Sequence, residues 1–316
     1  MKLATTTMQR LSIEAMQNKY EKIANLQTQI SSGQRIQKLS DDPAGAARIN
    51  ELTREIARYE QFSSNMDYAE TRLEFEETNL QSIGDVLQSV REEAVRAVNG
   101  TLNTQDRAAV AKQFELAAEQ LVGLMNAKGS DGEYIFSGYN SSVTPFSLTE
   151  IAPATTPPTW QGAYSGDNNQ RAVRIADGVT MPLGHAGQLS NGDALFGTGT
   201  APGTNGGENI AALIMNFAEE LKADNLASGG SILSQIDTVM ERVTNAQAEA
   251  GARMNMISSQ REVNLDYSLY LEQKKADVHD VDITEAITSL TQEMTSMQAL
   301  QQTYTRVNQL SLFNYL

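Results

Sequence analysis

The sequence "SSGQRIQKLSDDPAGAARI" (residues 31–49) lies between two segments that both favour helix, and it interrupts them. Gly33 is placed to adopt the left-handed conformation that closes a helix. Pro43 fits the first turn of a new helix, with Asp42 as its N-cap. A nine-residue polar connector separates the two signals. The chain is therefore expected to end one helix and begin another here.

A matching break occurs near the other end of the chain, in "DVHDVDITEAI" (277–287). Asp282 can cap the next helix, and Glu285, three residues later, completes a capping box. Both terminal helices are therefore predicted to be hinged from the rest of the chain by short connectors at comparable distances from the two ends.

Glycine and proline are concentrated in one part of the chain, residues 129–207, which holds 14 of the 22 glycines and six of the seven prolines. Such a density of helix breakers indicates turns, loops and short strands. The best strand candidates are "EYIFSGY" (133–139) and "RAVRIADGVTMPL" (171–183), which contain β-branched and aromatic residues. The remainder of the chain is predicted to be helical.

Apolar residues recur at heptad spacing after Pro43, which is typical of a helix that packs along another helix. The predicted partners are a helix near 104–128 and a long helix near 231–275, and three long helices of this kind favour a bundle. A shorter helix near 208–224 is predicted to return the chain from the insert. The heptad ladder consists of Leu52, Tyr59, Met66, Leu73, Leu80 and Leu87.

Both chain ends carry narrower apolar stripes, so each terminal helix is expected to be marginal without a partner. Residues 1–40 contain six Lys or Arg against two acids, whereas residues 277–316 contain one Arg against five acids, which favours pairing of the two ends. The predicted interface residues are Ile13, Met16, Tyr20, Ile23, Ile30, Ile283, Ile287, Leu290, Met294, Met297, Tyr304, Leu312, Phe313 and Leu316.

The predicted fold class is therefore mainly α: a long helical bundle or coiled-coil rod built from both chain ends, carrying a β-rich inserted outer domain. Residues 1–42 and 276–316 are expected to pair as an inner coiled-coil domain. Residues 43–138 and 208–275 form the predicted bundle, and residues 139–207 the Gly/Pro-rich insert. Because the terminal stripes are narrow, we expect the dilute monomer to have a folded middle and disordered ends.

Three separated motifs resemble the bacterial flagellin superfamily. "LQTQISSGQRIQKLSDDPAGAARI" (26–49) is similar to its N-terminal signature, and "AEAGARMNMI" (248–257) and "LSLFNYL" (310–316) are similar to its C-terminal one. The insert, with "GEYIFSGYNSSVTPF" (132–146) and "YSGDNNQRAVRIADG" (164–178), resembles the hook-associated members of the superfamily more than the filament flagellins.

The resemblance implies an extracellular axial protein of the bacterial flagellum that forms an adaptor ring between hook and filament. It implies export in an unfolded state by the type III apparatus with a dedicated chaperone, followed by self-assembly. The implied neighbours are another hook-associated protein on the hook side and flagellin on the filament side. In the family, paired terminal helices line the inner tube and the insert faces outward.

Composition and motifs argue against other classes. A net charge of −15 disfavours nucleic-acid binding, and no apolar run has the length of a membrane span or a cleaved signal peptide. The chain has no cysteine, and its two histidines, His185 and His279, lack metal-ligand spacing. No catalytic residue and no cofactor site is predicted, so the chain is expected not to be an enzyme.

Three alternatives remain open from the sequence. The first is a filament flagellin, the second is a self-contained coiled-coil adaptor, and the third is a protein with an enzymatic insert near 139–207. Preferential addition to hook ends distinguishes the junction protein from a flagellin. The third alternative is weakened because the insert shows no convergent nucleophile and base.

Overall fold

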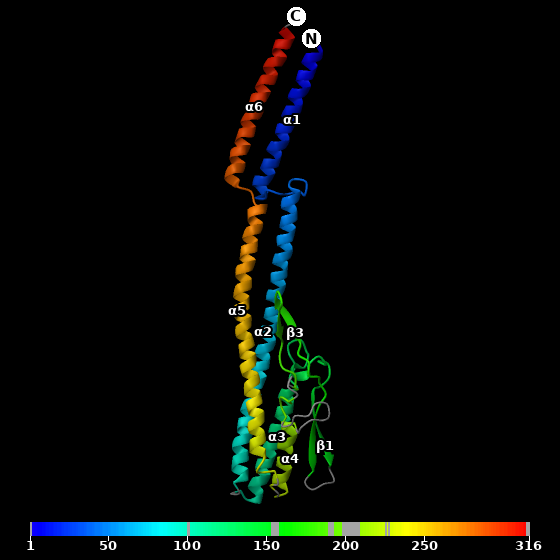
Figure 1. Cartoon of the computed structure of the whole chain (residues 1–316), viewed down its shortest axis with the longest axis vertical. Helices are drawn as coiled ribbons and strands as arrows, with labels where there is room; N and C mark the ends of the chain where they lie inside the picture. Colours follow the sequence, from blue (N-terminus) through cyan, green and yellow to red (C-terminus); the bar gives the residue numbers. More distant parts are fainter. Residues whose placement is uncertain are drawn as a thin grey trace. The chain divides into compact units, whose positions relative to one another are not determined.

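The computed structural model describes residues 2–99, 102–152, 158–188, 193–197, 209–224, 226 and 228–313; for residues 2–6, 9, 152 and 307–313 it describes the backbone only. The fold is mainly α, as predicted. Figure 1 shows its elements, which are, in chain order, α1 (Lys2–Ser32), α2 (Pro43–Val98), α3 (Thr104–Met125), the 3₁₀ turn η1 (Ile135–Ser137), β1 (Phe146–Ala152), β2 (Thr159–Tyr164), β3 (Ala172–Ala176), β4 (Val179–Pro182), α4 (Ile210–Lys222), α5 (Ile232–His279) and α6 (Ile283–Phe313).

The chain divides into two compact units. Unit 1 comprises Met1–Glu60 and Leu265–Leu316, and unit 2 comprises Gln61–Asn264. The long helices α2 and α5 each contribute residues to both units.

Unit 1 contains the helix pair α1 and α6, which lie side by side in Figure 1. It also contains the first part of α2 and the last part of α5. These two parts share a small core of Leu52, Ile56 and Leu271, against which Tyr59 packs. The Tyr59 and Tyr267 rings lie 4.9 Å apart between centroids. Unit 1 is thus built of helix pairs with little interior.

Unit 2 contains the main core, where side chains of α2, α3, α4 and α5 meet. The predicted heptad ladder supplies this core from α2, because Leu80 and Leu87 are fully buried in it. On α3, Phe114 packs edge-on against Phe217 of α4, with ring centroids 5.4 Å apart. Four helices therefore form this bundle, since the shorter helix packs along α3 as well as returning the chain from the insert.

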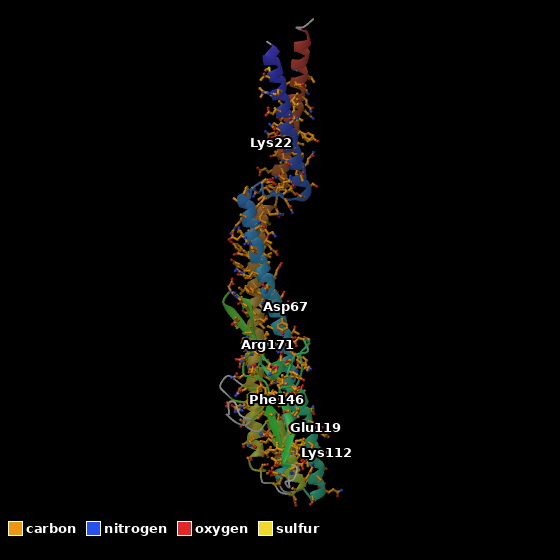
Figure 2. The ribbon with its side chains drawn as sticks, turned by 90° about the vertical axis from the view of Figure 1, so that its right-hand side faces the viewer. Lys22, Asp67, Lys112, Glu119, Phe146 and Arg171 are labelled. Atoms are coloured by element: carbon orange, nitrogen blue, oxygen red, sulfur yellow. The ribbon has the colours of Figure 1, made fainter. Side chains whose placement is uncertain are left out.

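The insert forms two antiparallel hairpins. Phe146 of β1 pairs with Tyr164 of β2, and Ala172 of β3 pairs with Pro182 of β4. In the first hairpin the Phe146 ring, labelled in Figure 2, lies 5.0 Å from the Tyr164 ring and 5.5 Å from the Phe196 ring between centroids. This aromatic contact belongs to the main core of unit 2.

The second hairpin lies across the middle of α2 and α5 within unit 2. Ile175 and Met181 join a separate buried cluster with Leu73 of α2 and Ile257 of α5. The Asn264 amide of α5 donates to the Ile175 carbonyl oxygen at 3.3 Å. The hairpin is therefore attached to the two helices by apolar burial and by side-chain hydrogen bonds.

Two details of the insert differ from the sequence prediction. Residues 133–139 were predicted as a strand, but they contain η1, and Gly138 follows it with φ of 71°. The segment turns because this left-handed glycine is incompatible with a continuing strand. Conversely, β1 and β2 were not predicted, and residues 171–183 form a hairpin with a turn at Gly178, φ 77°, instead of one extended strand.

Candidate assembly interface

The two helix breaks lie beside each other in unit 1. The Arg35 amide donates to the His279 carbonyl oxygen at 2.8 Å, and the Val281 amide donates to the Gly33 carbonyl oxygen at 3.0 Å. Two connectors that are more than 240 residues apart in the sequence are thus joined by main-chain hydrogen bonds. We call these residues, 33–42 and 279–282, the connector clasp.

The Arg35 side chain strengthens this clasp. Its guanidinium donates to the Val278 carbonyl oxygen at 2.8 Å and reaches the Asp42 carboxylate at 3.4 Å. Val278 belongs to the last turn of α5, where unpaired carbonyls give the helix end a partial negative charge. Sequence analysis did not single out Arg35, because its partner on α5 cannot be identified before the two breaks are known to meet.

The predicted cap residues lie at the ends of the connectors. Asp42 precedes α2 and accepts from the Gly45 amide at 2.9 Å; this bond, more than the nearby Arg35 charge, holds the pKa of Asp42 below its ordinary value. Asp282 precedes α6 and accepts from the Thr284 and Glu285 amides at 2.8 and 3.1 Å.

Gly33 provides a direct test of the clasp. Its φ is 73°, a conformation that costs an L-residue about 1–2 kcal/mol. We expect Gly33→Ala to destabilise unit 1 by about 1 kcal/mol, with faster hydrogen exchange at the Val281 amide. Gly84 lies inside α2 with ordinary φ and free space around it, so Gly84→Ala should stabilise the fold by roughly 0.5–1 kcal/mol.

The Gly33 variant is measured by hydrogen exchange in the assembled protein, where the terminal segments are expected to be ordered, and the Gly84 variant by urea unfolding followed by far-UV circular dichroism. If both alanine substitutions stabilised the protein to the same extent, Gly33 would not require a left-handed backbone conformation.

The predicted interface residues of α1 and α6 fall into two groups. One group is partly buried, and the other is exposed; the largest exposed fraction is 68%, at Tyr20. Among the described side chains of α1 and α6, Ala286 alone is buried. The partly buried group is Met16, Ile23, Ile30, Leu290, Met297 and Tyr304, and the exposed group is Ile13, Tyr20, Ile283, Ile287 and Met294.

The α1–α6 pair therefore covers one side of each helix and leaves apolar side chains outside. The apolar stripe of each helix is wider than the surface that the other helix covers, so a contact between two helices leaves part of the stripe exposed. The remaining predicted residues cannot be placed in either group: Leu312 and Phe313 lie in α6 where only the backbone is described, and Leu316 lies outside the described residues.

Among the described side chains, an ion pair between Lys19 of α1 and Glu293 of α6 joins the two helices. A shallow cleft of about 370 Å³ lies next to it, with Lys22, labelled in Figure 2, on its α1 side. Such partly exposed pairs contribute about 0.2–1 kcal/mol each. The pair therefore contributes more to the register of the helices than to their stability.

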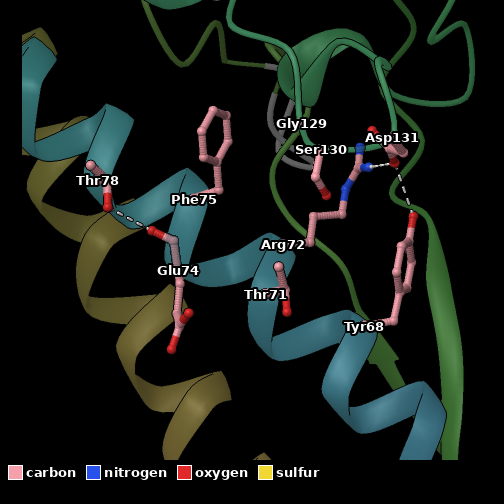
Figure 3. Close-up of a pocket in the computed structure, with 9 residues that line it drawn as sticks. All are labelled: Tyr68, Thr71, Arg72, Glu74, Phe75, Thr78, Gly129, Ser130 and Asp131. Carbon is pink, nitrogen blue, oxygen red and sulfur yellow. Dashed lines mark hydrogen bonds and ion pairs between the residues drawn. The ribbon is translucent and has the colours of Figure 1, made fainter.

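A second pocket, in unit 2, lies between α2 and the turn at residues 129–131 (Figure 3). Its Asp131 carboxylate accepts from the Arg72 guanidinium at 2.8 Å and from the Tyr68 hydroxyl at 3.1 Å. Burial acts to raise the pKa of Asp131, but the Glu133 amide and the Arg72 charge outweigh it and lower that pKa. The polar groups of this pocket thus hold the turn against α2, and they resemble a structural anchor more than an acid–base pair.

Two features are absent from the described part of the chain. No cluster of three or more His, Asp or Glu side chains there is arranged to hold a metal ion. No helix there is long and apolar enough to cross a bilayer.

Comparisons with known proteins identify the proteins that this chain resembles. Residues 4–141 match the family model described as the bacterial flagellin N-terminal helical region. This match covers the N-terminal part of the chain and confirms the resemblance to the class of flagellin-like proteins seen in the sequence.

Within that class it is similar over its length to flagellar hook-associated protein 3 of Escherichia coli and of Salmonella typhimurium, each 26% identical with 99% of both chains covered. Flagellin FlaB1 of Treponema pallidum is 25% identical, over 85% of this chain and 83% of the flagellin.

Solved structures show the same fold. A putative flagellar hook-associated protein from Vibrio parahaemolyticus matches with a TM-score of 0.64 and 24% identity, covering 76% of this chain and 100% of that one. Hook associated protein-3 from Legionella pneumophila matches with a TM-score of 0.58 and 19% identity, covering 73% and 99%.

Proposed function

We propose that this protein is a structural component of the bacterial flagellum that forms the adaptor ring between hook and filament. The observation that carries the proposal is the similarity to hook-associated protein 3 over 99% of both chains, for two relatives. The relatives are structural flagellar proteins, which supports a non-enzymatic role for this chain.

Its partners follow from that position. The ring forms from copies of this chain, with a hook-associated protein on the hook side and flagellin on the filament side. The protein reaches this extracellular site through the type III apparatus, delivered by a dedicated chaperone. The exposed apolar residues of α1 and α6 support lattice contacts, because large apolar groups left outside a helix pair commonly mark an interaction surface.

We further propose that the terminal segments order during assembly. Residues 1–42 and 276–316 would form the assembling domain, residues 43–138 and 208–275 the bundle, and residues 139–207 the outward-facing insert. The helix breaks at Gly33 and Asp282 support the boundary between the terminal segments and the bundle. The compact units divide at other positions, within α2 at residues 60/61 and within α5 at residues 264/265. A segment that orders only on lattice contact meets its ordering cost at that moment, which prevents early polymerisation.

The junction role is tested by where the protein adds. Purified chain is mixed with isolated hooks that carry the preceding hook-associated protein, and separately with filament fragments, and bound chain is counted by immunogold microscopy. We expect labelling at hook ends and flagellin growth from labelled hooks. Long filaments of the chain alone, or preferred addition to filament ends, would instead support a filament flagellin. Flagellin FlaB1 resembles this chain with an identity comparable to that of the hook-associated relatives, but over a shorter span.

Limited proteolysis of the dilute monomer tests coupled ordering. Because the described α1–α6 seam buries so few side chains, we expect both ends to be lost quickly, leaving a resistant fragment of about 43–275 that mass spectrometry can map. Equal resistance from residue 1 to 316 would indicate that the ends are packed in the monomer, as in a self-contained helical adaptor.

A further inference from the structure

The loop that follows β4 carries a buried histidine between two carboxylates. His185 is 3% exposed, and it lies where the loop 183–187 contacts α2 and α5 of unit 2. Its Nδ1 is 3.0 Å from the Glu76 carboxylate of α2, and its Nε2 is 3.1 Å from the Glu249 carboxylate of α5. One imidazole ring thus connects the insert to two helices.

With both carboxyl groups ionised, the geometry favours a proton on both ring nitrogens. A carboxylate oxygen only accepts hydrogen bonds when ionised, and a neutral imidazole donates from one nitrogen alone. In the neutral form, the lone pair of the other nitrogen would face a carboxylate oxygen at hydrogen-bond distance. The doubly protonated ring donates to both carboxylates and removes that repulsion.

The other groups around the ring reinforce this charge balance. The His185 amide also donates to Glu76, at 2.7 Å. Arg253 of α5 donates to the Gly184 carbonyl oxygen at 3.2 Å and to Glu249 at 2.5 Å. With the imidazolium present, two cations face two carboxylates; without it, the cluster carries one uncompensated negative charge.

That charge would remain in a poorly solvated place. Glu76 is fully buried, and its second oxygen, Oε2, has no hydrogen-bond partner. A Cβ at Gly184 would lie 3.1 Å from this oxygen, so the loop backbone approaches the carboxylate closely. Loss of the imidazolium therefore leaves a buried carboxylate with reduced compensation, which is costly.

We propose that His185 is a protonation-dependent latch that ties the loop 183–187, and with it the insert, to α2 and α5 in unit 2. The charged ring closes the latch, and the neutral ring opens it by turning one of its two hydrogen bonds into a repulsive contact. The latch is independent of the proposed place of the protein in the flagellum.

The sign of the pH dependence follows from the neighbours of His185. Burial acts to lower its pKa, but the hydrogen bond and charge of Glu76 and the bond to Glu249 outweigh burial and the Arg253 charge, so the pKa lies above its ordinary value of 6.5. A raised folded pKa means that the latch is complete below pH 6.5 and is lost as the pH rises through the folded value.

Two other titratable groups near the loop, Glu249 and Tyr164, have pKa values shifted away from this range. Burial acts to raise the pKa of Glu249, but His185 and Arg253 lower it below its ordinary value. Tyr164 of β2 contacts the loop through the Gly187 amide, and burial raises the pKa of its phenol. Proton access is available from the Glu249 side, because that side chain is 57% exposed.

The test is an NMR titration of the two histidines in the full chain, with His279→Gln used to assign the His185 signals. We expect both ring nitrogens of His185 to be protonated at pH 6, and its titration to occur above pH 6.5. Hydrogen exchange at the His185 amide, corrected for the intrinsic pH dependence, should accelerate about tenfold across that titration. The Phe146 amide, which donates to Asn126, should not respond to it.

Glu76→Gln keeps the shape but removes the buried charge, so it should lower the pKa of His185 and accelerate exchange at the His185 amide already at pH 6. Glu77→Gln, one residue along α2, is the matched control and should leave both values unchanged. The latch would be overturned if His185 were singly protonated at pH 6, or if hydrogen exchange at its amide did not change as the ring titrates.

Discussion

Replacing Leu290 and Met297 together by Asp should abolish assembly at hook ends while leaving unit 2 intact. Both side chains are partly buried, seven residues apart on the α6 stripe that is predicted to face α1, and Glu293, which pairs with Lys19 of α1, lies between them in the sequence. Two carboxylates in this seam lose apolar contact and must be desolvated, at about 3 kcal/mol in total, roughly a hundredfold in an association constant.

The control uses the same spacing on the exposed side of the helix. Thr291 and Gln298 are one residue further along α6, and both are exposed. Thr291→Asp with Gln298→Asp adds the same two charges without touching the seam, so assembly should persist. If this variant also failed, net charge and not the seam would explain the loss.

A single tryptophan reports on unit 2 separately. Trp160 of β2 is partly buried, and its amide donates to Asn216 of α4 at 2.7 Å, within unit 2. Thermal unfolding followed by Trp160 fluorescence should be unchanged in the Leu290→Asp/Met297→Asp variant. A clear drop in that transition temperature would mean that the α1–α6 seam is an ordinary part of the folded core.

The helices were predictable because their signals are local. The heptad ladder identifies the buried face of α2 without any knowledge of its partners, and Leu73 and Leu80 are fully buried. The breaks were equally local, since Gly33 and Pro43 act on their own backbone. Element bounds were close: α5 extends four residues beyond the predicted end at residue 275.

The strands of the insert were not predictable in the same way. β1 and β2 are a two-stranded hairpin whose apolar contacts come from Phe196 and from helices distant in the sequence, so alternation along each strand is weak. Conversely, "EYIFSGY" has the composition of a strand, yet Gly138 takes a left-handed conformation that turns the chain. Tertiary contacts overrode the local preference in both cases.

The polar contacts of His185 and Arg35 also could not be predicted from the sequence. His185 meets Glu76 and Glu249, which are 109 and 64 residues away, and Arg35 meets Val278, 243 residues away. No sequence motif marks either set of contacts, because the partners come together only when the insert folds back or when the two helix breaks meet. The sequence did identify the regions in which both sites lie.

Truncating Phe114 should be the most destabilising single change considered for unit 2. The ring is 1% exposed and packs edge-on against Phe217 at the centre of the contact between α3 and α4. Phe114→Ala removes that burial and leaves a cavity, which typically costs about 3–5 kcal/mol. Urea unfolding followed by Trp160 fluorescence should show this loss as a lower midpoint with a similar slope.

Leu116 supplies the matched comparison, because it lies two residues away on α3 and is 55% exposed. Leu116→Ala should change the free energy of unfolding by no more than about 0.5 kcal/mol. The contrast matters for the proposed function as well as the fold, since the proposal requires a bundle that is stable before the terminal helices order. Similar losses in the two variants would show that α3 is not packed on α4 through Phe114, and a self-sufficient bundle would then need another explanation.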